Sequence, residues 1–159
     1  MPNWKKAVEQ FFAKSDPNGE FYHCAEDGLS AKDITSVLKK LKMQVPDELR
    51  DFYGQFNGLG LTNDETEFPN FIPPIEYLSD LVIAARTAFP KSHKTYADRY
   101  LSVVNWENGD TCGYVMKEDG SFVDCFFMFN HELCSHEKSQ DVNEFLTPVA
   151  ENLYSFLSE

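Results

Sequence analysis

The segment from His131 to His136 holds the densest group of side chains that could do chemistry. It reads His131-Glu132-Leu133-Cys134-Ser135-His136, and imidazole, thiolate and carboxylate are the groups that zinc prefers. In the zinc-protease helix the two histidines stand four residues apart, so that both point to one metal. Here they stand five apart, after an apparent strand, which leaves only adventitious binding by His131, Cys134 and His136. The spacing therefore predicts no metal site, and we expect no cofactor.

Catalytic groups are also hard to assemble from the other reactive side chains. Cys24 or Cys134 could pair with a nearby histidine, but nothing in the sequence places a third group to orient that base. His23 and Cys24 are neighbours, and neighbours on a strand point to opposite faces. Asp110 and Asp124 could meet across a hairpin, although turn capping and surface charge explain both more simply. Glycine-rich phosphate loops are absent from the sequence. We therefore expect no catalytic residue and no enzymatic activity.

The compartment is predicted from the cysteines and the N-terminus. The N-terminus lacks the apolar stretch of a signal peptide, and no apolar run approaches the roughly 18 residues that cross a bilayer. We expect a cytoplasmic protein with no membrane association. Its four cysteines, Cys24, Cys112, Cys125 and Cys134, are then expected to be reduced and idle.

Acidic residues dominate the charge of the chain. The 159 residues hold 14 Lys and Arg against 26 Asp and Glu, a net charge of −12. The imbalance lies after residue 45, because residues 1–45 hold 7 basic and 6 acidic side chains. Such a surface repels phosphate backbones, which argues against nucleic acid as a partner, and it attracts a basic protein. Solubility alone would also account for the acidity.

The elements that position these residues follow from periodicity and turn signals. Apolar residues at helical spacing predict a short N-terminal helix before Asp16, a second helix from about Ser30 to Met43, and a third that begins at Pro46 and stops at Asn57-Gly58. The segment from Phe21 to Gly28 is either strand or loop. Residues 59–67 are expected to form an acidic loop, Phe68–Ile72 a short strand, and Ser79–Ala88 a further helix.

The second half of the chain predicts an antiparallel meander. Its strands are Tyr100–Trp106, Cys112–Met116 and Ser121–Phe129, separated by turns at Asn108-Gly109-Asp110 and Glu118-Asp119-Gly120. The run Phe126–Phe129 indicates a central strand. A final helix after Asp141 is expected to bury Phe145 to Leu157, with Pro148 either kinking it or marking its first turn. The fold class is therefore α+β, with an antiparallel sheet flanked by N-terminal, middle and C-terminal helices in one domain spanning residues 1–159.

The order of these motifs resembles the SUKH superfamily, which includes the yeast cell-wall-assembly and cell-proliferation coordinating regulator and many bacterial immunity proteins. The resemblance covers about residues 30–158 and leaves the N-terminal helix outside. It rests on the helix from Ile34 to Leu41, Val45-Pro46-Asp47-Glu48-Leu49-Arg50-Asp51-Phe52-Tyr53, Asn57-Gly58, Phe71-Ile72-Pro73-Pro74-Ile75, Gly109-Asp110-Thr111-Cys112-Gly113-Tyr114 and the C-terminal helix.

A scaffold needs several of these residues for structural reasons. Pro46 suits the first turn of a helix. Asn57 and Gly58 can reverse the chain, and Asp110 can accept N–H bonds in its own turn. Gly113 permits a bulge or close packing within a strand. We therefore assign Pro46, Asn57, Gly58 and Gly113 to the structural motif.

The resemblance implies an immunity protein that binds and neutralises a cognate toxin, and a nuclease is a candidate class of toxin. Residues 47–76 hold 7 acidic and 1 basic side chain, and residues 107–144 hold 9 and 2. If these stretches share a face, that face would bind a basic toxin domain. The candidate contact residues are Asp64, Glu65, Glu67, Glu107, Asp110, Glu118 and Asp119.

Two other functions stay open at this stage. One is a non-enzymatic regulatory scaffold of the kind that the yeast relative implies, and the other is a small-molecule binder or enzyme on the same fold. The protein is expected to be a monomer or a weak dimer, because an exposed strand edge could pair two copies.

Overall fold

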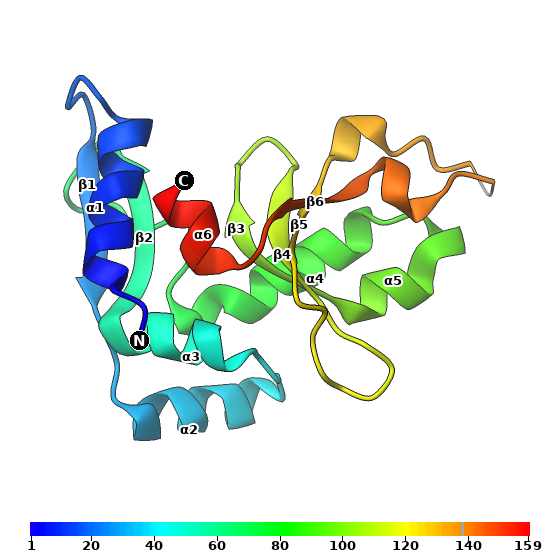
Figure 1. Cartoon of the computed structure of the whole chain (residues 1–159), viewed down its shortest axis with the longest axis horizontal. Coiled ribbons are helices and arrows are strands. Elements are labelled where there is room, and N and C mark those ends of the chain that lie inside the picture. The colour runs from blue at the N-terminus through cyan, green and yellow to red at the C-terminus, as the bar shows by residue number, and fades with distance from the viewer. Residues whose placement is uncertain (138) are drawn as a thin grey trace. The chain divides into compact units, whose positions relative to one another are not determined.

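The predicted N-terminal helix is present as α1 (Trp4–Ser15) in the computed structural model, which describes residues 1–137 and 139–159 (Figure 1). The side chain of Asn3 caps this helix by accepting a hydrogen bond from the N–H of Lys6. The apolar face predicted from the spacing, including Trp4 and Val8, is buried. Strand β1 (Tyr22–Asp27) follows α1, so the ambiguous segment is a strand.

The next two helices begin where the sequence predicts. In α2 (Ala31–Leu41) the hydroxyl of Ser30 accepts a hydrogen bond from the N–H of Asp33 at 3.1 Å, which is the expected N-terminal cap. Helix α3 (Asp47–Gln55) follows Pro46 directly and carries acidic residues in its first turn, where the helix dipole favours negative charge.

The predicted end of α3 is wrong. The helix stops at Gln55, and Phe56 already has extended backbone angles (φ −140°, ψ 126°), so Asn57 and Gly58 lie inside strand β2 (Phe56–Thr62). The buried Asn57 side chain accepts a hydrogen bond from the N–H of Ile75 at 2.9 Å. Gly58 has a φ of +112°, and a Cβ there would come 2.9 Å from the ring of Pro69. Asn57 and Gly58 therefore support the packing of strand β2 and do not end a helix.

The segment after Gly58 also differs from the prediction. Residues 59–62 belong to β2, which pairs antiparallel with β1 and places Thr62 opposite Tyr22, so the acidic loop is shorter than residues 59–67. No strand spans Phe68–Ile72; within the described part of this segment, only Ile72 forms a bridge, to Leu59. The polar, acidic character of residues 59–67 favours a loop, but pairing with β1 makes residues 59–62 a strand.

The described chain divides into two compact units. Unit 1 comprises Met1–Tyr77 and Leu153–Glu159, so the C-terminal helix α6 (Leu153–Ser158) returns to it. Helices α1, α3 and α6 pack together in this unit (Figure 1). Trp4 packs edge-on against Phe52 and Tyr154, with ring centroids 5.3 and 5.5 Å away. The Trp4 indole N–H donates to the Asp51 carboxylate at 2.8 Å. The N-terminal helix is thus part of the core of unit 1.

Unit 2 comprises Leu78–Asn152 and holds the predicted meander. The short 3-10 turn Ile75–Tyr77 precedes it, and helices α4 (Leu78–Ala88) and α5 (Lys94–Arg99) begin it, joined by the 3-10 turn Lys91–His93. Four strands follow in the antiparallel order β3-β4-β5-β6. Their bounds are Tyr100–Asn105, Thr111–Val115, Phe126–Phe129 and Leu146–Ala150. Strand β5 is central, as the Phe-rich run indicates, although it begins five residues later than predicted.

The predicted final helix is wrong over most of its length. Short 3-10 turns at His131–Leu133 and Val142–Glu144 are followed by strand β6, in which Pro148 pairs with Phe127. Pro148 therefore neither kinks nor opens a helix. Proline is tolerated in β6 because an edge strand has one side that needs no N–H donor. Within the described part of the predicted final helix, only α6 is α-helical. None of the helices in residues 1–137 and 139–159 has the length and apolar character to cross a bilayer.

Aromatic residues form the core of unit 2. Phe89, at the end of α4, stacks on Phe129 of β5 with centroids 4.7 Å apart, and both contact Phe145 edge-on. The buried hydroxyl of Tyr100 shares a hydrogen bond of 2.9 Å with that of Thr111, which satisfies both polar groups inside the core. This core fixes α4 and α5 against the sheet.

Gly113 lies at a close approach between β3 and β4. It pairs with Ser102, next to a register shift between Ser102 and Val104 that marks a β-bulge. A Cβ on Gly113 would overlap the backbone carbonyl of Leu101. Only glycine permits this approach without moving a strand.

We expect Gly113→Ala to lower the free energy of unfolding by about 1–3 kcal/mol, because the added methyl must push the two strands apart. Gly54→Ala is the matched control. Gly54 lies within α3, and the nearest atom that its Cβ would meet is the Leu29 carbonyl oxygen at 4.0 Å, so alanine should raise stability by about 0.5–1 kcal/mol. Urea denaturation of the three proteins measures both changes. Equal effects at the two positions would contradict the close approach.

Candidate partner-binding surface

The acidic turn after β2 is held in shape by its own carboxylate. The Asp64 side chain accepts hydrogen bonds from the backbone N–H and the hydroxyl of Thr66, both at 2.9 Å. These bonds lower the pKa of Asp64 below its ordinary value of 3.8, because they stabilise the charged form. The turn therefore carries a fixed negative charge at neutral pH.

Two further exposed carboxylates belong to the same turn. Glu65 and Glu67 are exposed, and the Glu67 carboxylate accepts a hydrogen bond of 3.4 Å from the N–H of Asn63. The Glu67 carbonyl accepts from the thiol of Cys24 on β1 at 3.8 Å. The turn is thus attached to the β1–β2 sheet, and its acidic side chains face solvent.

Exposed aromatic residues lie beside this turn, and sequence reasoning missed them. Phe68 is 66% exposed and meets the 47% exposed Tyr77 edge-on, with centroids 6.1 Å apart. Tyr22 of β1, opposite Thr62, is 51% exposed. The sequence predicts a strand at Phe68, whereas its position between Glu67 and Pro69 in an acidic segment is the signal that indicates exposure. We call Asp64, Glu65, Glu67, Phe68 and Tyr77 the acidic–aromatic surface.

In the turn between β3 and β4, the Asp110 carboxylate is engaged in hydrogen bonds within the protein. Asp110 is only 8% exposed and accepts hydrogen bonds from the backbone N–H and the ring Nδ1 of His131, at 2.9 and 2.6 Å. Its own N–H donates to Asn108. Asp110 therefore ties the hairpin to the segment after β5, which sequence reasoning did not anticipate. Glu107 in the same turn is exposed, next to Trp106, which is 43% exposed.

The turn between β4 and β5 carries the last two candidates. The Asp119 carboxylate accepts from the hydroxyl and the N–H of Ser121, and these bonds lower its pKa. Glu118 forms an ion pair with Arg99 at 3.3 Å. Because successive turns of a meander lie at opposite ends of the shared strand, this turn is separated from Glu107 and Asp110 by the length of β4.

The seven predicted contact residues thus lie in three separate turns. Asp64, Glu65 and Glu67 belong to unit 1, and the other four belong to the two ends of β4 in unit 2. The unit 1 turn is the strongest candidate because it alone places several exposed carboxylates beside an exposed aromatic pair. Interfaces typically combine such aromatic anchors with a polar rim.

The cysteine and histidine side chains considered for metal binding or nucleophilic catalysis lie in surroundings that do not activate them. Burial raises the pKa of Cys24 and Cys125, and raises that of Cys112 to about 12, which keeps these thiols protonated. Cys24, Cys112, Cys125 and Cys134 form no disulfide. The His131 ring is bonded to Asp110, and the part of the chain that the structure describes contains no group of three or more His, Cys, Asp or Glu arranged as metal ligands.

Comparison with known proteins identifies one family. The family model described as SMI1 / KNR4 family (SUKH-1) matches residues 28–159, which confirms the resemblance to the SUKH superfamily. A comparison with curated proteins finds no match. The matched region begins after α1 and β1, yet both elements are built into unit 1.

We expect Asp110→Ala to destabilise the protein by about 1–3 kcal/mol, because it removes the acceptor of two hydrogen bonds from His131. Asp124→Ala is the control, since it removes the same charge from an exposed position and should change stability by less than about 0.5 kcal/mol. Thermal or urea unfolding measures both. Unchanged stability of the Asp110→Ala protein would contradict a structural role for this carboxylate.

Proposed function

Because the chain belongs to the SMI1 / KNR4 family (SUKH-1), whose members include immunity proteins and regulators, we propose that it is an immunity protein that binds and neutralises a cognate toxin. In this proposal it acts in the cytoplasm, catalyses no reaction and requires no cofactor. The family supports a protein-binding role, and the toxin is the partner class that we add.

The observation that carries the proposal is the acidic–aromatic surface. Its carboxylates would attract a basic partner and speed the encounter, while Phe68 and Tyr77 would supply the apolar contact that slows dissociation. The hydrogen bonds from Thr66 to Asp64 hold the turn before any partner arrives, which reduces the entropy lost on binding. These are the properties of a preformed protein-binding site.

A nuclease toxin is the specific partner that this surface favours. Nucleases hold phosphate backbones with Lys and Arg, so their substrate sites are basic. A protein with a net charge of −12 can cover such a site or compete with the nucleic acid for it. Neutralisation then requires only tight binding, with no chemistry from the inhibitor.

Recovery of the partner from the source cell is the first test of the proposal. Tagged protein should retain a basic toxin domain at low salt and lose much of it at high salt, since salt screens contacts between exposed charges. Identification of the retained proteins by mass spectrometry also names the partner. Retention of signalling or cell-wall proteins in place of a toxin would favour the regulatory scaffold over immunity.

Charge reversal tests the surface itself. The double variant Glu65→Lys and Glu67→Lys should weaken toxin binding at least tenfold, and Phe68→Ala should cost about 1–2 kcal/mol of binding free energy. Glu9→Lys combined with Glu20→Lys is the matched control, because it reverses two exposed acids in the same unit and makes the same change in net charge. Calorimetric titration measures all three. Unchanged affinity in the double variant and in Phe68→Ala would remove the acidic–aromatic surface from the interface.

A further inference from the structure

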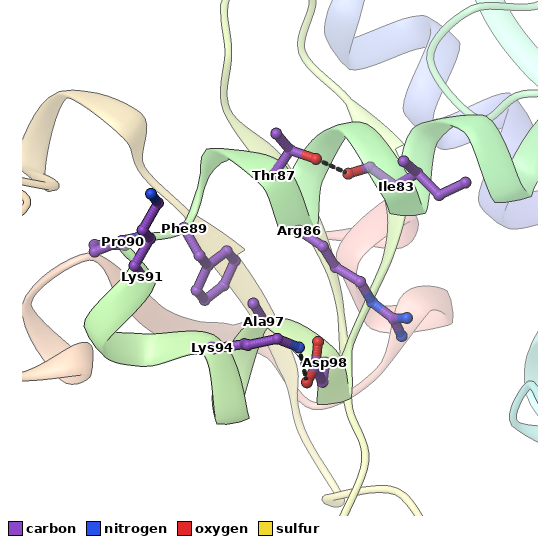
Figure 2. Close-up of a pocket in the computed structure, with 9 residues that line it drawn as sticks. All are labelled: Ile83, Arg86, Thr87, Phe89, Pro90, Lys91, Lys94, Ala97 and Asp98. Carbon is purple, nitrogen blue, oxygen red and sulfur yellow. Dashed lines mark hydrogen bonds and ion pairs between the residues drawn. The ribbon is translucent and has the colours of Figure 1, made fainter.

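A cationic groove lies between α4 and α5 in unit 2, on a chain whose net charge is −12. Its volume is about 570 Å³, within the range of binding sites for small ligands and side chains. Buried Phe89 and Ala97 form its floor, and Figure 2 shows both between the two helices. Arg86 of α4 and Lys94 of α5 are among the residues that line it. We call this site the α4–α5 groove.

The charges of the groove are only partly balanced within the protein. Arg86, Lys91 and Lys94 line it together with one carboxylate, Asp98. Asp98 is already paired with Lys94, whose ammonium lies 2.6 Å from it. The remaining excess of charge in the groove is positive. Between Asp80 and Asp98 the chain has no acidic residue, so this segment differs in sign from the acidic turns.

Arg86 has unused hydrogen-bonding capacity inside the groove. Its Nε donates to the Tyr100 carbonyl at 3.0 Å, which fixes the direction of the side chain. In the described part of the chain the two η nitrogens have no hydrogen-bond partner. Figure 2 shows the guanidinium extending from α4 toward the end of α5 that carries Asp98. Burial lowers the pKa of Arg86, and Asp98 opposes this effect. A partly desolvated guanidinium with free N–H groups favours a carboxylate, which it can bind through two parallel hydrogen bonds.

We propose that the α4–α5 groove binds a short acidic segment of a partner protein, with an apolar side chain on Phe89 and Ala97 and carboxylates at Arg86 and Lys91. Charge complementarity selects this occupant. The excess of positive charge comes from more than one residue, so a segment with several carboxylates balances it better than a ligand with a single anionic group. The acidic–aromatic surface takes a basic partner, so the two sites have opposite preferences.

An acetylated peptide of alternating glutamate and leucine is the probe. In an NMR titration it should shift the backbone amides of Arg86, Lys91, Ala97 and Asp98. The same peptide with glutamine in place of glutamate should bind at least tenfold more weakly. Lys91→Glu should reduce the affinity at least fivefold, and because Lys91 is exposed this variant should fold normally. Arg86→Glu should abolish binding.

Lys5→Glu is the matched control, since it makes the same charge change on an exposed residue of α1 and should leave peptide binding unchanged. The Glu65→Lys and Glu67→Lys protein should also bind the peptide normally, which separates failure of this proposal from failure of the proposed toxin-binding function. Equal binding of the glutamate and glutamine peptides, or an unchanged affinity in Lys91→Glu, would overturn the proposal. Binding of decanoate in the groove without binding of the peptide would overturn it in favour of a small anionic amphiphile.

Discussion

The return of the C-terminal helix to unit 1 is the constraint on which the rest of that unit depends. Helix α6 spans only Leu153–Ser158, too short to be stable alone, and its first N–H groups need acceptors. The Glu48 carboxylate accepts from the N–H groups of Leu153 and Tyr154 at 3.1 and 3.0 Å. Trp4 then packs against Tyr154 and Phe52 together. One carboxylate on α3 thus joins segments that lie more than 100 positions apart in sequence, and the N-terminal helix depends on that junction.

The parts of the fold that could be predicted are those set by local sequence. The Ser30 cap, the Pro46 helix start and the hairpin turns of unit 2 depend on residues within a few positions of each other. Errors occurred where pairing between distant segments decided the outcome. Asn57 and Gly58 have the residue types of a helix stop, but pairing with β1 places them in a strand. The apolar spacing from Phe145 to Leu157 matches a helix, whereas pairing with β5 makes residues 146–150 a strand.

The candidate site shows the same difference between features set by local sequence and features set by packing of distant segments. The acidic turns were visible in the sequence because charge is a property of composition. The exposure of Phe68 and its contact with Tyr77 were not, because they depend on how β2 and the following segment pack. The sequence could not distinguish the buried Asp110 from the exposed acidic residues, because its hydrogen-bond partner His131 lies 21 positions away. The α4–α5 groove could not be predicted, because it depends on how α4 and α5 pack around Phe89 and Ala97.

In the sequence, unit 2 is inserted between the two segments that form unit 1. This order has a consequence for biosynthesis. A ribosome that makes about 5–20 residues per second needs on the order of 4–15 s to synthesise Leu78–Asn152 before it reaches α6. During that interval the nascent N-terminal segment lacks the helix that covers Trp4, and its aromatic side chains stay open to chaperones or to aggregation. Unit 2, in contrast, has all of its strands before the last helix is translated. The order of translation therefore favours completion of the meander first, and the N-terminal helix reaches its final packing last.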